Sequence, residues 1–237
     1  MERATLESFL APISKQLGHD QVPEDVTPFD YKKEAPARLV DGLSNEALVK
    51  MFAAEAQKIR VDVRMCTKAE VAATVADIVG AAEEAGSVVF ADDVRIDGLA
   101  IPAALEASDK VTQAIRWDAS QGREALAETC NAARFGITYT RGGIAETGTI
   151  VQPCSETCGR AISLLPLAHI ALVDADSIKA TLGDWMQLLR DEGGENGAGL
   201  PAQVCFISGP SVTSDIELVR VEGVHGPMYV HYIVIEG

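Results

Sequence analysis

The chain contains no apolar stretch that approaches the ~20 residues needed to span a membrane. Its N-terminus also lacks the basic start and apolar core of a secretory signal peptide, so we expect a cytoplasmic protein. Basic residues are few: 20 Lys and Arg stand against 35 Asp and Glu, a net charge of -15 over 237 residues. Because this surplus negative charge repels a phosphate backbone, the composition argues against binding to nucleic acid or anionic membranes.

Several cofactor signatures are also absent. The sequence has no Gly-x-Gly-x-x-Gly, no Gly-x-x-x-x-Gly-Lys-Ser/Thr and no Gly-x-Ser-x-Gly, which leaves a dinucleotide fold, a P-loop and a nucleophile elbow without support. No Cys-x-x-Cys pair occurs either. The five cysteines are scattered at positions 66, 130, 154, 158 and 205, which is not the pattern of a disulfide framework. We expect neither a metal nor a cofactor held by this chain alone.

Hydrophobic periodicity predicts an α/β fold in which a mostly parallel sheet is covered by helices on both faces. The predicted helices cover residues 48–59, 71–82, 126–133 and 178–189, and the predicted strands cover residues 61–66, 87–90, 111–117, 136–140, 149–152, 170–173, 204–207 and 228–235. Residues 1–43 are expected to form a short helix and a proline-containing arm, and residues 44–237 a single domain. The glycine-rich residues 191–200 are expected to form a surface loop.

Three glycine-bearing clusters in the last hundred residues border short apolar runs: residues 143–149 (GIAETGT), 208–217 (SGPSVTSDIE) and 223–227 (GVHGP). Glycine lets a backbone turn sharply and lets a ligand approach closely, so the clusters suggest a binding rim. In the first cluster, Glu146 is a candidate general base or nucleophile, and the alternative is that it caps exposed backbone N–H groups. Arg141 precedes it and could pair with Glu146 or with a substrate carboxylate.

The second cluster follows the strand predicted at 204–207, where ligands bind in open parallel sheets. Ser208, Ser211 and Thr213 offer hydroxyls, and Asp215 is a candidate acid, base or orienting group. The alternative is a well-capped strand-to-helix turn, because Ser214-x-x-Glu217 fits a capping box. In that case Asp215 and Glu217 would stabilise the helix start themselves and repel an anion.

In the third cluster, His225 is a candidate proton exchanger because it stands alone between glycines. His169 and His231 lie in apolar strands and are interpreted as core or edge residues. Cys154-x-x-x-Cys158 is a weak redox signal, and Arg160 could face either an anion or solvent. The candidate binding residues are Arg141, Gly148, Thr149, Arg160, Ser208, Gly209, Ser211, Thr213 and Gly226, and the candidate catalytic residues are Glu146, Asp215 and His225.

Four motifs in this order resemble the lactate-utilization protein C family, which carries the LUD domain. They are residues 144–149 (IAETGT), 163–166 (SLLP) with His169-Ile170, 208–211 (SGPS) with residues 215–217 (DIE), and 223–227 (GVHGP). The resemblance covers roughly residues 45–237 and departs at residues 139–143, where a more acidic or apolar lead-in would be expected. The residues it carries over most strongly are Glu146, Gly148, Ser208, Gly209, Pro210, Asp215, Glu217, His225 and Gly226.

This resemblance implies a fold similar to ribose-5-phosphate isomerase, glucosamine-6-phosphate deaminase and the CoA transferases. It also implies a role in oxidising L-lactate to pyruvate together with two iron–sulfur partner proteins. On this interpretation the chain has no redox centre, and electrons leave through clusters or a flavin on partner chains. The alternatives are a stand-alone enzyme acting on a sugar phosphate or a CoA thioester, and a non-catalytic scaffold subunit.

Overall fold

The computed structural model describes residues 3–19, 21, 40, 42–194, 199–214 and 220–237. Contacts divide the chain into two units, residues 1–39 and residues 40–237. The sequence-based boundary falls between residues 43 and 44. In the first unit, α1 (Arg3–Gln16) is an α-helix that contains Pro12. None of the described helices is long and apolar enough to cross a bilayer.

A six-stranded parallel sheet forms the centre of the second unit, with the strand order β1-β12-β7-β4-β2-β3. Its strands are β1 (Asp62–Thr67), β2 (Gly86–Phe90), β3 (Val111–Arg116), β4 (Phe135–Tyr139), β7 (Ala168–Asp174) and β12 (Tyr229–Glu236). The helices are α3 (Asn45–Lys58), α4 (Val71–Gly80), α5 (Val94–Gly98), α6 (Ile101–Glu106), α7 (Arg123–Ala132), α8 (Ala161–Leu164) and α9 (Leu182–Gly193), with short 3-10 turns at Ala119–Gln121 and Ala175–Ser177. This architecture confirms the predicted fold class.

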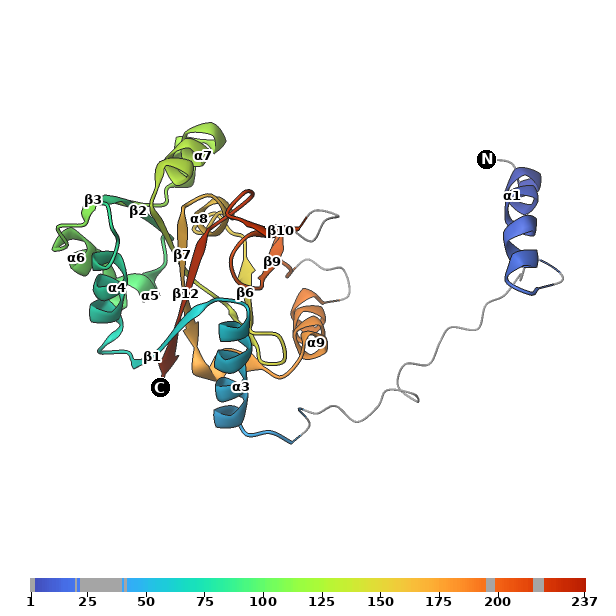
Figure 1. Cartoon of the computed structure of the whole chain (residues 1–237), viewed down its shortest axis with the longest axis horizontal. Helices are drawn as coiled ribbons and strands as arrows, with labels where there is room; N and C mark the ends of the chain where they lie inside the picture. The colour runs from blue at the N-terminus through green and yellow to red at the C-terminus, as the bar shows by residue number, and fades with distance from the viewer. Residues whose placement is uncertain (1–2, 20, 22–39, 41, 195–198, 215–219) are drawn as a thin grey trace. The chain divides into compact units, whose positions relative to one another are not determined.

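A second sheet of four strands lies beside the first, in the order β8-β5-β6-β9, and was not predicted from the sequence. It consists of β5 (Gly142–Ile144), β6 (Thr149–Pro153), β8 (Ile178–Lys179) and β9 (Val204–Ile207), and β6 runs antiparallel to both β5 and β9. Figure 1 shows α4, α5 and α6 on one side of the central strands β7 and β12, and β6, β9 and α9 on the other.

The two faces of β7 explain how these layers are held together. Ile170 and Leu172 pack into one buried cluster with residues of α4, whereas the alternate residue Ala171 packs into a second cluster with Phe52 of α3 and Tyr232 of β12. The rings of Phe52 and Tyr232 stack with centroids 5.6 Å apart. Because successive strand residues point to opposite faces, a continuous apolar run is what a strand buried on both sides requires.

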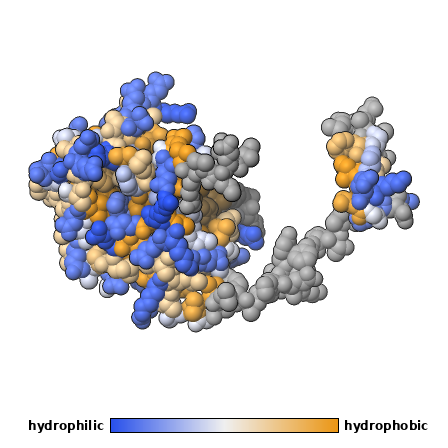
Figure 2. Space-filling model, viewed as in Figure 1, coloured by the Kyte–Doolittle hydropathy of each residue, from blue (hydrophilic) through white to orange (hydrophobic). Residues whose placement is uncertain are grey.

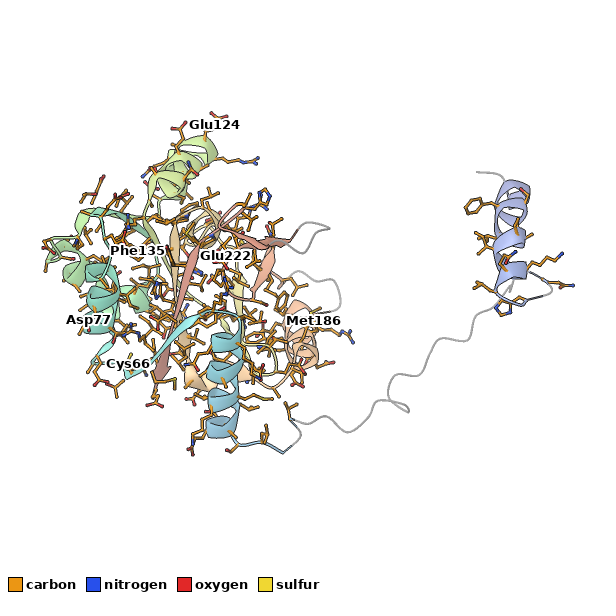
Figure 3. The ribbon with its side chains drawn as sticks, in the orientation of Figure 1. Cys66, Asp77, Glu124, Phe135, Met186 and Glu222 are labelled. Atoms are coloured by element: carbon orange, nitrogen blue, oxygen red, sulfur yellow. The ribbon has the colours of Figure 1, made fainter. Side chains whose placement is uncertain are left out.

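The surface contrasts with this interior. Figure 2 shows blue hydrophilic side chains spread over the visible face of the domain, with smaller orange patches between them. In Figure 3, Phe135 lies among the packed side chains of the central sheet, and Glu124 stands at the outer side of α7. Phe135 is 6% exposed, which fits its place in the core. On α9, Met186 is 49% exposed while its neighbour Trp185 is buried, as expected for an amphipathic helix.

Two sequence-based element assignments need correction. The helix predicted over residues 178–189 begins only at Leu182, because Ile178 and Lys179 pair with β5 as the strand β8. Thr181 and Asp184 form the capping box that starts α9. Ser214 is the last residue of β10 (Val212–Ser214), which pairs antiparallel with β11 (Arg220–Glu222), and Glu217 of the expected capping box lies outside the described residues. Of the loop predicted over residues 191–200, positions up to Gly193 belong to α9 and residues 195–198 lie outside the described residues.

Candidate functional site

The first glycine cluster connects β5 to β6 and lies against the start of α9. The backbone N–H of Glu146 donates to the carbonyl of Ala180 at 3.1 Å, and its carboxylate accepts from the backbone N–H of Leu182 at 3.0 Å. A carboxylate at a helix N-terminus satisfies an otherwise unpaired N–H and interacts favourably with the helix dipole. The structure therefore gives Glu146 the capping role that the sequence left open as an alternative, and its role as a base stays a prediction.

Gly148 in the same cluster faces α3 at very close range. Its φ is +60°, and a Cβ at this position would lie 2.3 Å from the backbone nitrogen of Ala56. Only glycine avoids both the left-handed strain and this clash with helix backbone. Gly148 thus allows α3, a helix of the same domain, to pack closely against this turn.

Three hydroxyls link the first cluster to the second. The oxygen of Thr149 lies 2.7 Å from that of Thr147 and 2.7 Å from that of Ser208. Thr149 is 5% exposed, whereas Ser208 and Thr147 lie at the surface. Beside them, a Cβ on Gly209 would lie 2.6 Å from the carbonyl oxygen of Ile59. The fold therefore brings Thr149 and Ser208 together, as one binding region would require.

The second and third clusters also adjoin, through their backbones. The N–H of Ser211 donates to the carbonyl of Pro227 at 2.9 Å, and a Cβ on Gly226 would lie 3.2 Å from the Cβ of Ser211. His225 and Thr213 are exposed. Asp215 and Glu217 lie outside the described residues. Ligands bind beyond the carboxyl ends of strands in open parallel sheets. This rule does not apply to residues 204–207, because β9 belongs to the second sheet and runs antiparallel to β6.

Three of the predicted binding residues line three different cavities. Arg141 lines one of about 390 Å³, Arg160 one of about 540 Å³ and Gly226 one of about 360 Å³. Arg160 also donates to the side-chain oxygen of Gln203 at 3.1 Å. A further cavity of about 620 Å³ lies along α3, and its charged lining residues are Glu46, Lys50, Asp176 and Glu236. This excess of negative charge does not suit an anion.

We call the cavity that contains Arg141 the cationic cavity. Its lining consists of Arg95, Tyr139, Arg141, Pro153, Ser177, Lys179, Trp185 and Leu188. Three of these side chains are cations and none is a carboxylate, while Pro153, Trp185 and Leu188 supply apolar surface. Such a mixture of apolar surface with a few polar groups is typical of small-molecule sites.

Its position in the fold follows the rule for open parallel sheets. Tyr139 ends β4, Arg95 follows β2 within α5, and Ser177 follows β7, so these residues come from the carboxyl ends of central strands. The strand order reverses between β2 and β4, because the chain continues from β2 to β3 on one side and from β4 towards β7 on the other. Ligands bind at such a switch point in doubly wound sheets.

Tyr139 is fixed in this cavity by its neighbours. Its hydroxyl donates to the Asp174 carboxylate at 2.6 Å, and the guanidinium carbon of Arg95 lies 3.8 Å from the centre of its ring. Burial, and then the bond to Asp174, raises the pKa of Tyr139 far above its usual value. The tyrosine therefore stays protonated at neutral pH and serves as a hydrogen-bonding group.

Two of the three cations already have carboxylate partners outside the lining. Arg95 contacts Asp93 through two nitrogens, at 3.0 and 2.6 Å, and Arg141 pairs with Glu192 of α9. Among the described contacts, no carboxylate pairs with Lys179, which is half-buried. The cavity thus holds one cation that a bound anion could neutralise.

Sequence reasoning identified Arg141 but missed Arg95, Tyr139, Ser177 and Lys179. The signal that could have identified Arg95 and Tyr139 is their position at or just after the ends of buried strands. Lys179 carried no such signal, because it lies in the two-residue strand β8, inside a segment whose spacing resembles a helix.

The surroundings of His169, His231 and Cys158 indicate structural roles. His169 is fully buried with Nε2 2.8 Å from the Thr138 hydroxyl, and burial lowers its pKa to about 3. His231 lies 3.1 Å from Asp62, so both histidines occupy the core and edge positions expected of them. Burial raises the pKa of Cys158 to about 12, which keeps that thiol neutral. Within the described ranges, no group of three or more His, Cys, Asp or Glu side chains is placed to hold a metal ion.

Known proteins resemble this chain over most of its length. The family model described as the LUD domain matches residues 49–235. A lactate utilization protein C from Anoxybacillus flavithermus is 30% identical over 97% of this chain and 99% of its own length, and one from Halalkalibacterium halodurans is 31% identical over 97% of both chains. A crystal structure of a DUF162 family protein from Deinococcus radiodurans superposes with a TM-score of 0.56 at 22% identity, covering 81% of this chain and 99% of that one.

Proposed function

This chain belongs to the LUD domain family, and on that premise we propose that it takes part in lactate utilisation. More specifically, we propose that it is a subunit of a system that oxidises L-lactate to pyruvate with iron–sulfur partner proteins. The observation that carries the proposal is the near-complete coverage of relatives named lactate utilization protein C, at about 30% identity. This similarity spans 97% of the chain and is therefore not confined to a fragment of it.

The oxidation of lactate needs an electron acceptor, and we propose that other chains supply it. Oxidation of a 2-hydroxy acid to a 2-oxo acid removes two electrons and two protons from the substrate. We propose that the electrons pass to clusters or a flavin on the partner proteins. This chain then contributes substrate binding or assembly, for which the cationic cavity offers the most suitable surface.

Reconstitution tests this proposal directly. The full-length chain is purified and combined with the two iron–sulfur proteins, and lactate-dependent reduction of an artificial electron acceptor is measured with and without it. We expect the rate to depend on this chain and to saturate when its amount matches that of the partners. An unchanged rate in its absence contradicts the proposal.

Growth provides an independent measurement. A strain that lacks this chain is expected to grow on glucose but poorly on L-lactate, and the wild-type gene is expected to restore growth on lactate. As a control, a plasmid carrying the Phe52→Asp variant removes a buried core residue and should fail to restore growth. Normal growth of the deletion strain on lactate argues against the proposed function.

A further inference from the structure

We propose that Cys154 and Cys205 form a reversible disulfide by exchange with a low-molecular-weight disulfide, which makes this pair a site of oxidative modification. The proposal goes beyond the proposed function and does not depend on it. It rests on the strand register that brings the two cysteines together, on their partial exposure and on the contacts that hold the neighbouring Cys158 in the interior.

The register of β6 and β9 places the two cysteines on one face of the second sheet. The strands pair antiparallel, with Gln152 opposite Cys205. The pairing continues one residue beyond β6, because the N–H of Cys154 donates to the carbonyl of Gln203 at 2.9 Å. Directly opposed residues share a face of the sheet, and so do residues two positions apart in a strand. Cys154 and Cys205 are therefore diagonal neighbours on the same face.

A disulfide between diagonal neighbours requires a small movement of the chain. Diagonal residues have Cβ atoms somewhat less than about 7–8 Å apart, whereas a disulfide needs a separation of about 3.5–4.5 Å. Cys154 lies where such a movement is easiest, because β6 ends at Pro153 and residues 155–157 are exposed. Strained and accessible disulfides are the readily reduced ones, so a bond formed here is reversible.

The two thiols already influence each other in the reduced protein. Burial, and then the nearby Cys205 thiol, raises the pKa of Cys154, while the charge and the backbone N–H of Arg160 act in the opposite direction. The Gln203 amide donates to the sulfur of Cys205 at 3.7 Å and accepts from Arg160 at 3.1 Å. Because a raised pKa leaves little thiolate at neutral pH, exchange is slow there and becomes faster as the pH rises.

Cys158 is kept out of the pair by its own contacts. Its N–H donates to the Ser155 hydroxyl at 3.0 Å, and its sulfur accepts from the side-chain amide of Gln152 at 3.5 Å. The spacing Cys154-x-x-x-Cys158 therefore marks only one member of the pair. The other member comes from β9, and only the folding of the second sheet brings it near.

The exchange consists of two balanced steps. The Cys154 thiolate, beside Arg160, attacks one sulfur of the small disulfide RSSR, whose S–S bond breaks to release RS⁻ and leave a mixed disulfide on Cys154. The Cys205 thiolate then attacks the sulfur of Cys154, and the mixed bond breaks to release a second RS⁻. The two protons lost by the cysteines end on the released thiolates. The protein thus loses two electrons, and RSSR is reduced to two RSH.

The disulfide would connect two segments that lie next to the glycine clusters. It would join the turn that follows β6 to β9, the outer strand of the second sheet. β9 leads directly into Ser208, whose hydroxyl lies 2.7 Å from that of Thr149 in β6. In the oxidised protein, a covalent bond therefore holds together two strands that hydrogen bonds alone hold in the reduced protein.

Thiol mapping on the purified full-length chain tests the proposal. The reduced chain is incubated with oxidised glutathione at about pH 8, where thiolate forms more readily. The remaining thiols are blocked with N-ethylmaleimide, and the denatured protein is digested after glutamate without reduction. Glu156 separates Cys154 from Cys158, and Glu192 separates Cys158 from Cys205, so each thiol falls in its own peptide. We expect a peptide pair that links Cys154 to Cys205 and that dithiothreitol dissociates.

Three results overturn the proposal. They are a link between Cys154 and Cys158, five free thiols after an excess of oxidised glutathione, and a glutathione adduct on Cys154 that Cys205 does not displace. The same incubation in urea is the control for the role of the fold. In the unfolded chain the short loop between Cys154 and Cys158 closes more readily than the long one to Cys205. If the link to Cys205 forms as readily in urea, the fold does not position the pair and the proposal is wrong.

Variants identify the two partners. Cys154→Ser and Cys205→Ser should each abolish the linked peptides, and the remaining cysteine of the pair should carry glutathione instead. Cys158→Ser is the matched control, because it removes a neighbouring thiol outside the pair and should leave the link intact. Cys158→Ala takes its place if circular dichroism shows the serine variant to be unfolded. Loss of the link in a folded Cys158 variant overturns the assignment of the pair.

Discussion

The carboxylate of Glu146 accepts a hydrogen bond from the backbone N–H of Leu182 at 3.0 Å and so ties the turn between β5 and β6 to the first residue of α9. These residues are 36 positions apart in the chain. The same helix supplies Trp185 and Leu188 to the cationic cavity and Glu192 to the ion pair with Arg141. The position of one exposed carboxylate is thus connected, through α9, to one wall of the cavity.

This relationship predicts that Glu146 contributes to stability in the manner of a helix cap. Glu146→Ala should lower the free energy of unfolding by about 1 kcal/mol, the usual cost of losing a side-chain cap. Glu146→Gln retains a side-chain oxygen that can accept from Leu182 and should cost less. Urea denaturation followed by circular dichroism measures both. If Glu146→Gln abolishes function in reconstitution while its stability matches wild type, the carboxylate has a chemical role in addition to capping.

Gly148 predicts a much larger effect from adding a single methyl group. In Gly148→Ala the new Cβ would lie 2.3 Å from the nitrogen of Ala56, in a backbone conformation with φ of +60°. We expect a loss of about 2 kcal/mol or more, because the strand turn and α3 must move apart. Gly183→Ala is the matched control: it lies in α9, where the new Cβ meets nothing closer than 3.5 Å, and should leave stability unchanged or raise it. Similar melting temperatures for the two variants would contradict this account.

The three linked hydroxyls allow a test of whether the second glycine cluster has more than a structural role. Thr149→Val removes contacts to both Thr147 and Ser208 and should cost about 1 kcal/mol, since Thr149 is buried. Ser208→Ala removes an exposed hydroxyl and should cost less than half of that. Denaturation curves give both values. Loss of lactate-dependent growth with Ser208→Ala at normal stability would indicate that this hydroxyl contacts a substrate or partner.

His169 predicts a specific dependence of stability on pH. Burial lowers its pKa in the folded state to about 3, whereas in the unfolded chain it titrates near its ordinary value of 6.5. Between these values the unfolded state binds more protons, so stability is full above about pH 6.5 and falls as the pH decreases towards 3, by up to about 1.4 kcal/mol per pH unit.

The comparison of wild type with His169→Asn isolates this contribution, because the other titrating groups, including His231 and Asp62, are common to both proteins. We expect the free energy of unfolding of wild type to fall more steeply than that of the variant between pH 7 and pH 5. Parallel curves would show that His169 does not titrate differently in the folded and unfolded states.

Most elements of the central sheet could be predicted from the sequence because their pattern is local. The apolar run at residues 170–173 and the helical spacing of Val71, Val75, Ile78 and Val79 both specify their own type of structure. They correspond to β7 and α4. The failures concern short segments with weak periodicity. Ile178 and Lys179 became a strand because β5 lies next to them, and no pattern within residues 178–189 encodes that partner.

The amino-acid sequence by itself determined the fold class, the buried strands and the family. Burial on both faces of a strand requires a continuous apolar run, and the four family motifs occur in the same order in this chain. Only the tertiary structure decided which strands share a sheet. It placed β9 in an antiparallel sheet, turned Glu146 towards α9 and gathered Arg95, Tyr139 and Lys179 around one cavity. Strand pairing and side-chain convergence depend on contacts between residues far apart in the chain, and hydrophobic periodicity carries no information about them.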